Sequence, residues 1–113
     1  MHGIKLIVYP VKDLAAATTL YSALLGIEPY AVSPYYVGYR MGDQEIGLDP
    51  NGHSQGLTGP LAYWTVDDVK ASFQAYLDAG AQVRRPVTDV GGGKLIATVA
   101  DADGNVIGLT QAS

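Results

Sequence analysis

Val66-Asp67-Asp68-Val69 repeats Val11-Lys12-Asp13-Leu14, which lies 55 residues earlier in the chain. Later in each half, Ile46-Gly47-Leu48 matches Ile107-Gly108-Leu109, and six extra residues in the second copy account for the larger offset of 61. A repeat of this length indicates two copies of one supersecondary unit. The fold can therefore be predicted from one copy and checked against the other.

The first copy predicts the order strand, helix, strand, strand, strand. Residues 4–11 are a short apolar run rich in β-branched side chains, which favours a strand. Asp13 follows as a candidate N-cap, and apolar side chains at three- and four-residue spacing predict a helix over residues 13–25. Gly26 is suited to close it. Three further strands are expected, over residues 28–32, 35–41 and 44–48.

The second copy predicts the same order. We expect a strand over residues 61–66, a helix that Asp68 caps and Gly80 ends, and a strand over residues 82–86. Two apolar runs around Asp103-Gly104 predict a closing hairpin, over residues 95–100 and 105–110. The chain is thus predicted to be one mixed α+β domain over residues 1–113, with repeats over 3–50 and 60–113 and a glycine-rich linker over 51–59.

Composition excludes several classes of protein. The chain has 113 residues, of which 48% are hydrophobic and 16% charged, so it can bury a core and does not have the composition of a disordered chain. A net charge of −4 with only seven basic residues argues against nucleic-acid binding. The chain has no cysteine, no apparent leader and no apolar run long enough to span a membrane. We expect a cytoplasmic protein without a membrane or nucleic-acid partner.

The repeated βαβββ pattern, with the Val-x-Asp-Leu segment in the first copy and Asp101-Ala102-Asp103-Gly104-Asn105 in the second, resembles the vicinal oxygen chelate superfamily. That superfamily includes glyoxalase I, bleomycin-resistance proteins and extradiol dioxygenases. The resemblance implies two units that curl their sheets into a cupped, barrel-like mixed sheet, with the helices outside and a ligand inside. It also implies a homodimer. It says little about function, because one fold hosts many chemistries.

In metal-dependent members of the superfamily, four cup-facing side chains hold the ion. A histidine usually lies seven residues before each capping aspartate, and those positions hold Leu6 and Leu61 in this chain. The glutamates of the last strands correspond to Gly47 and Gly108. A full protein zinc site is worth about 10–16 kcal/mol, so each ligand contributes roughly 3–4 kcal/mol. Because all four positions lack a donor, we expect no metal at the family's site and no other cofactor.

Tyrosines are the most informative side chains that remain. Eight of the ten aromatic residues are tyrosines, and four of them cluster between Tyr30 and Tyr39. Alternation along a strand places Tyr36 and Arg40 on one face of the third strand and Tyr39 on the other. The sequence does not decide which face lines the cup. Tyr63 shares a face with Leu61. The two glycines of the last strands leave open space in the cup for a flat apolar or aromatic molecule. Tyrosine packing at a dimer interface is the simpler alternative.

The predicted ligand-binding set combines these positions with two carboxylates. Glu45 and Asp49 share the face of Gly47 by strand alternation, and a buried carboxylate there could act as a base or bind a cation. The set is Leu6, Val8, Tyr36, Tyr39, Arg40, Glu45, Gly47, Asp49, Leu61, Tyr63 and Gly108. His2 and His53 are expected to be solvated, although His53 could lean over the cup.

Three functions are compatible with this set. The leading hypothesis is metal-independent binding of a small apolar or aromatic organic molecule, for sequestration or carriage, as in bleomycin-resistance proteins. A glyoxalase- or dioxygenase-like enzyme that uses displaced metal ligands, such as Glu45, Asp49 and His53, is an alternative. The third is a metal-free enzyme with Glu45 or a tyrosine as the acid–base group. No catalytic residue can be assigned from the sequence.

Overall fold

The structure, a computed structural model, describes residues 2–111. Its chain divides into two units, one over residues 5–61 and the other over residues 62 onward together with residues 2–4. In the described part of the chain, each unit contains one α-helix and four β-strands. The mixed α+β class and the two βαβββ repeats are thereby confirmed. The division between the units falls after residue 61.

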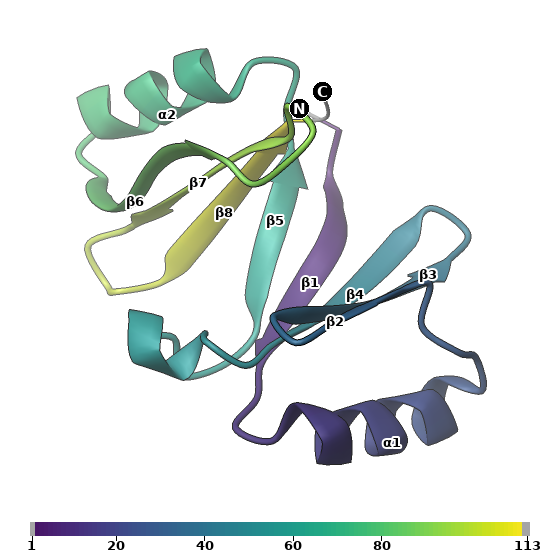
Figure 1. The fold of residues 1–113 in the computed structure, drawn as a ribbon. Helices are drawn as coiled ribbons and strands as arrows, with labels where there is room; N and C mark the ends of the chain where they lie inside the picture. The colour runs from purple at the N-terminus through teal and green to yellow at the C-terminus, as the bar shows by residue number, and fades with distance from the viewer. Residues whose placement is uncertain (1, 112–113) are drawn as a thin grey trace. The chain divides into compact units, whose positions relative to one another are not determined.

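In the first unit, the helix lies on one face of a mixed sheet (Figure 1). The sheet has the order β2-β3-β4-β1, with β1 parallel to β4 and the other two pairs antiparallel. The elements are β1 (Ile4–Pro10), α1 (Leu14–Leu25), β2 (Ala31–Ser33), β3 (Tyr36–Met41) and β4 (Gln44–Asp49).

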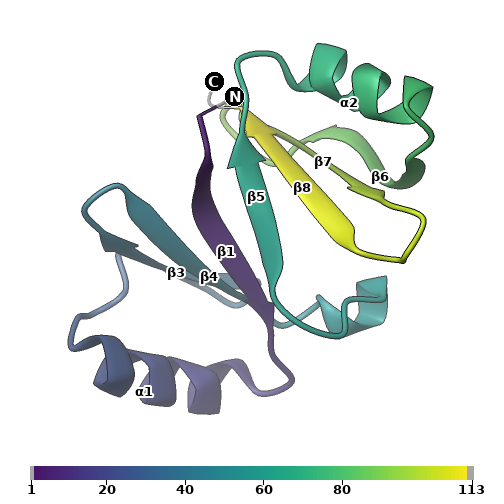
Figure 2. The same cartoon turned by 180° about the vertical axis from the view of Figure 1, so that it is seen from behind.

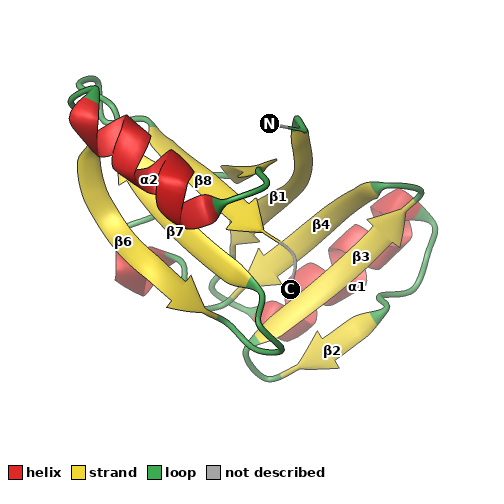
Figure 3. Cartoon of the chain, turned by 90° about the horizontal axis from the view of Figure 1, so that it is seen from above, coloured by secondary structure: helices red, strands yellow, loops and turns green. Residues whose placement is uncertain are grey.

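The predicted caps of α1 are present. Asp13 Oδ1 accepts a hydrogen bond from the Ala16 amide at 3.0 Å, and Gly26 takes the left-handed conformation at φ 70°. The apolar stripe of the helix packs against the sheet, where Val37, Tyr39 and Leu48 form the buried centre of the core. Figure 3 shows α1 behind β3 and β4.

The second unit repeats this arrangement. Its sheet has the order β5-β8-β7-β6, with β5 parallel to β8 and the other pairs antiparallel. Figure 2 shows α2 along β6 and β7. Val66, Val69, Ala97 and Leu109 form its buried core. The elements are β5 (Leu61–Thr65), α2 (Val69–Asp78), β6 (Gln82–Asp89), β7 (Leu95–Ala100) and β8 (Val106–Gln111).

Most predicted bounds agree with the structure to within a residue, but two strands differ by more. β2 begins at Ala31 and not at residue 28, and Pro29, which lacks an amide donor, lies before it. β6 continues past Pro86 to Asp89, because two register shifts allow an edge strand to contain a proline. The linker is ordered: it contains the 3₁₀ turn His53–Gln55, and a β-carbon on Gly52 would come within 2.5 Å of Pro10 Cβ.

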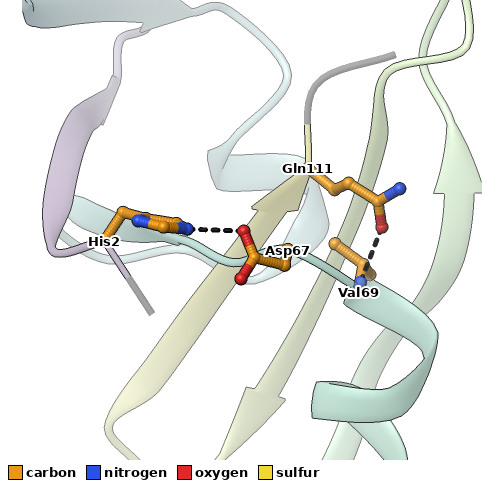
Figure 4. A network of polar contacts seen from close by, with 4 residues as sticks. All are labelled: His2, Asp67, Val69 and Gln111. Atoms are coloured by element: carbon orange, nitrogen blue, oxygen red, sulfur yellow. Dashed lines mark hydrogen bonds and ion pairs between the residues drawn. The ribbon is translucent and has the colours of Figure 1, made fainter.

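The N-terminal residues belong to the second unit. The His2 amide donates to Thr65 O at 2.8 Å, and the Thr65 amide donates to Gly3 O at 2.9 Å. Figure 4 shows the imidazole of His2 bonded to Asp67, next to the start of α2, where Gln111 accepts a hydrogen bond from the Val69 amide. Neither α-helix of the described chain, of 12 and 10 residues, has the length required to cross a bilayer.

Candidate functional site

Strand register defines the face of the first sheet that points away from α1, here called the first helix-distal face. Val8 and Gly38 are both Cα partners of Gly47, and Leu6 and Arg40 are both partners of Glu45. Since side chains alternate along a strand, these partners share one face. Six of the predicted ligand-binding residues lie on it: Leu6, Val8, Arg40, Glu45, Gly47 and Asp49. Tyr36 shares the face by the same alternation.

Tyr39, another member of the predicted ligand-binding set, does not lie on this face. Its side chain points to the opposite face, is fully buried and belongs to the core beneath α1. The hydroxyl is also used within the protein, because it donates to Thr18 O at 3.0 Å and bonds Ser22 Oγ at 2.8 Å. Tyr39 is therefore a core residue that anchors the helix to the sheet.

The open space that was expected beside Gly47 is occupied by the ring of Tyr36. A β-carbon on Gly47 would lie 2.7 Å from Tyr36 Cζ, and one on Gly38 would lie 3.1 Å from Tyr36 Cε2. Real β-carbons do not come this close to other heavy atoms. The Tyr36 ring therefore occupies the volume that a side chain at position 47 would need. The ring extends across two glycines that are Cα partners on neighbouring strands.

Tyr30, which precedes β2, joins Arg40 and Glu45 in a polar cluster on the same face. The Tyr30 hydroxyl donates to Glu45 Oε1 at 2.6 Å, and Arg40 Nη2 donates to the same oxygen at 3.2 Å. The guanidinium carbon of Arg40 lies 4.2 Å from the centroid of the Tyr30 ring, in cation–π geometry. Burial, and then the hydrogen bond to Glu45, raise the pKa of Tyr30. Tyr30 is therefore a protonated donor at neutral pH.

Asp49 and His53 are not arranged as a displaced metal site. Asp49 Oδ1 accepts a hydrogen bond from the Asn51 amide at 2.8 Å, so the carboxylate closes the turn after β4. His53 is exposed on the 3₁₀ turn. Within residues 2–111, no group of three or more metal-binding side chains is close enough to hold an ion.

The second unit has the corresponding face, here called the second helix-distal face. Tyr63 is the Cα partner of Gly108, and the ring of Tyr63 covers the glycine, since a β-carbon on Gly108 would lie 2.6 Å from Tyr63 Cδ1. Leu61 shares this face, and both Leu61 and Tyr63 are buried. The covering ring comes from β5 here and from β3 in the first unit, so the two units fill the same position with side chains from different strands.

The four positions that the resemblance assigns to the metal ligands carry no donor side chain. Leu6 and Leu61 have no donor atom, and a tyrosine ring lies where the side chain of a ligating glutamate would start at Gly47 and at Gly108. The absence of a metal in the protein itself stays a prediction, and its test is given in the Discussion.

Two features of the site were missed in the sequence. Tyr30 was predicted to lie in the strand over residues 28–32, but β2 begins at Ala31, so alternation along a strand could not place its side chain. Thr98 and Thr110 lie on the second helix-distal face and are buried polar residues. The alternation from Gly108 places Thr110 on this face, which was the available signal.

Comparisons with known proteins agree with this architecture. The model of the Glyoxalase/Bleomycin resistance protein/Dioxygenase superfamily matches residues 3–109. No curated protein matches the chain. Among solved structures, methylmalonyl-CoA epimerase from Mycobacterium tuberculosis is similar with a TM-score of 0.77 and 17% identity, over 98% of this chain and 88% of that one.

Two further structures share the fold. A superfamily member from Vibrio splendidus 12B01 has a TM-score of 0.72 and 14% identity, over 95% of this chain and 97% of that one. The Mn(II)-bound glyoxalase from Novosphingobium aromaticivorans has a TM-score of 0.70 and 18% identity, over 96% of this chain and 38% of that one. At these identities the likenesses show the fold alone, whereas the family model spans nearly the whole chain. The chain belongs to the Glyoxalase/Bleomycin resistance protein/Dioxygenase superfamily.

Proposed function

We propose that this protein binds a small apolar or aromatic organic molecule on its helix-distal faces without a metal ion. The observation that carries the proposal is the tyrosine ring over Gly47 in one unit and over Gly108 in the other. A tyrosine ring that covers a glycine on a sheet can act as a stacking platform, worth about 0.5–1.5 kcal/mol per aromatic contact beyond area burial. The ligand thus contacts the rings of Tyr36 and Tyr63 and not the backbone of Gly47 and Gly108.

Charge on the first helix-distal face supports an uncharged ligand. Arg40 is paired with Glu45, and Tyr30 donates to the same carboxylate oxygen. A ligand with a charged group would have to compete with these internal partners, whereas a neutral ring would leave them in place.

The test measures binding of 2-naphthol by calorimetry to two matched variants. Tyr36→Leu removes the ring over Gly47 and is expected to weaken binding about three- to tenfold. Tyr35→Leu is the control, because Tyr35 is the adjacent residue, is 73% exposed and lies outside the strands. Equal binding by both variants, or failure of any aromatic compound to shift the Tm of the wild type, would contradict the proposal.

A metal-free enzyme is the second candidate, and one contact favours it. The 2.6 Å hydrogen bond from Tyr30 to Glu45 places a proton donor beside a carboxylate, which is the arrangement needed for general acid–base chemistry. Glu45→Gln keeps the size of the side chain and removes its basicity. If the protein is an enzyme of this kind, the variant loses turnover of the substrate while still binding it. Unchanged turnover would dismiss this candidate.

The homodimer implied by the family resemblance is also part of the proposal. Light scattering on the purified chain tests it directly. A mass of one chain across the micromolar range would contradict it.

A further inference from the structure

The hydroxyl of Thr110 is buried without a partner. Thr110 is 7% exposed, and its Oγ1 has no hydrogen bond within the described chain. The residue lies on β8, with Thr65 and Ile96 as its Cα partners. Leu109 next to it packs in the core with α2, so alternation directs Thr110 to the second helix-distal face, on the same side as Gly108.

An unpartnered hydroxyl at this position lowers stability. A buried hydroxyl without a hydrogen bond carries a desolvation penalty that an apolar side chain of the same shape does not. Valine has that shape and suits a strand at least as well as threonine does. Natural proteins accept such local losses of stability mainly where a residue serves function.

We infer that Thr110 Oγ1 is the group that hydrogen-bonds an oxygen atom of the bound molecule, an inference that rests on the proposed function. The ring of Tyr63 covers Gly108, which lies two residues before Thr110 on β8, so a ligand ring that stacks on Tyr63 lies next to Thr110. Thr110 then exchanges a hydrogen bond with the ligand, as either donor or acceptor.

The surroundings of Thr110 determine the chemical class of the ligand. A charged group on the ligand would need an opposite charge or several donors there, and a lone hydroxyl does not supply them. The molecule is therefore a neutral aromatic ring carrying one hydroxyl or carbonyl oxygen, as in a phenol. On β5, β7 and β8, the side chains that register and alternation place on this face are all uncharged at neutral pH: Leu61, Tyr63, Thr65, Ile96, Thr98, Val106, Gly108 and Thr110. The charged residue that register adds from β6, Arg85, is the Cα partner of Thr98, whereas the partners of Thr110 are Thr65 and Ile96.

The experiment compares phenol with toluene, which has the same ring but no oxygen. Calorimetry gives the ratio of their dissociation constants for the wild type and for Thr110→Val. We expect the ratio to shift against phenol by about three- to tenfold in the variant, because only phenol loses a hydrogen bond. Thr110→Ser keeps the hydroxyl and should keep the wild-type ratio.

Thermal unfolding gives a second readout that needs no ligand. Thr110→Val is expected to raise the Tm by about 2–6 °C, since it removes a buried unpartnered polar atom. Thr88→Val is the matched control in the same unit: Thr88 Oγ1 donates to Pro86 O at 2.7 Å, so its loss should lower the Tm and leave the phenol-to-toluene ratio unchanged.

The outcomes separate the two ideas. Binding of both compounds with an unchanged ratio in Thr110→Val would overturn the role of Thr110 and leave the proposed function standing. A fall in Tm for that variant would also overturn the inference, because the hydroxyl would then have a partner. If the wild type bound neither compound, this inference would be rejected, and the 2-naphthol titration would decide whether aromatic binding stands.

Discussion

The far end of the Tyr36 ring lies where a β-carbon of residue 47 would be if Gly47 had one. A β-carbon there would be 2.7 Å from both Cε1 and Cζ of the ring. Gly108 meets the base of its tyrosine instead: its β-carbon would lie 2.8 Å from Tyr63 Cγ and 2.9 Å from the backbone oxygen of Ala62. The far end of a side chain can rotate away, whereas a backbone oxygen cannot.

This difference predicts unequal effects of alanine at the two glycines. Gly108→Ala should lower the free energy of unfolding by about 2–3 kcal/mol, because overpacking against the backbone forces the sheet to shift. Gly47→Ala should cost about 1 kcal/mol or less, since Tyr36 can swing out. Chemical denaturation of both variants gives the comparison. Equal costs, or a larger cost at Gly47, would show that the rings do not lie as described.

Gly47→Ala also separates stability from binding. Displacing Tyr36 should weaken binding of 2-naphthol as much as Tyr36→Leu does, although the protein stays folded. Wild-type affinity in Gly47→Ala would show that the orientation of the Tyr36 ring is irrelevant to the ligand.

The hydroxyl of Tyr39 should contribute to stability and not to binding. Tyr39→Phe leaves Thr18 O and Ser22 Oγ without their buried partner, which costs about 1–2 kcal/mol of unfolding free energy. Denaturation and 2-naphthol titration together test this: stability falls and affinity is unchanged. A loss of affinity at full stability would return Tyr39 to the ligand-binding set.

Much of the fold could be predicted because local chemistry and the repeat agreed. Asp13 and Asp68 cap the two helices as predicted, since each carboxylate accepts an amide from three residues on. The end of β6 was not predictable in this way. Pro86 suggested that the strand stops there, but register shifts that the sequence does not reveal allow it to continue to Asp89.

The candidate site was less predictable for a physical reason. Alternation assigns a side chain to a face, but it does not say whether a glycine on that face is open or covered by a neighbour. Tyr36 and Tyr63 cover their glycines through χ angles and cross-strand contacts, which depend on the packed sheet. The same limit applied to Tyr39, whose face became clear only when the core beneath α1 was known.

The His2–Asp67 contact predicts a pH dependence at the N-terminus. The hydrogen bond from His2, and then its charge, lower the pKa of Asp67. A carboxyl whose pKa is lowered by folding stabilises the folded state above its ordinary pKa, and this stabilisation is lost as the pH falls through the lowered value. In His2→Ala, we expect the pKa of Asp67 to return to its ordinary range, as measured by NMR titration of the carboxyl carbon.

Asp101 provides the internal control for that titration. Its pKa is lowered by hydrogen bonds from the side chain and backbone of Asn105, which do not involve His2. It should therefore be unchanged in His2→Ala. If both carboxyls shifted together, the substitution would have altered the whole unit, and the His2–Asp67 contact would not be the cause.

Removal of divalent metal should leave ligand binding unchanged. Protein purified without chelator is expected to contain no stoichiometric zinc, nickel, manganese or iron by mass spectrometry, because Leu6 and Leu61 supply no donor and tyrosine rings cover Gly47 and Gly108. Treatment with EDTA should then alter neither the Tm nor the affinity for 2-naphthol. About one equivalent of metal, lost with EDTA together with binding, would mean that other side chains hold an ion and that the protein should be assayed as a metal-dependent enzyme.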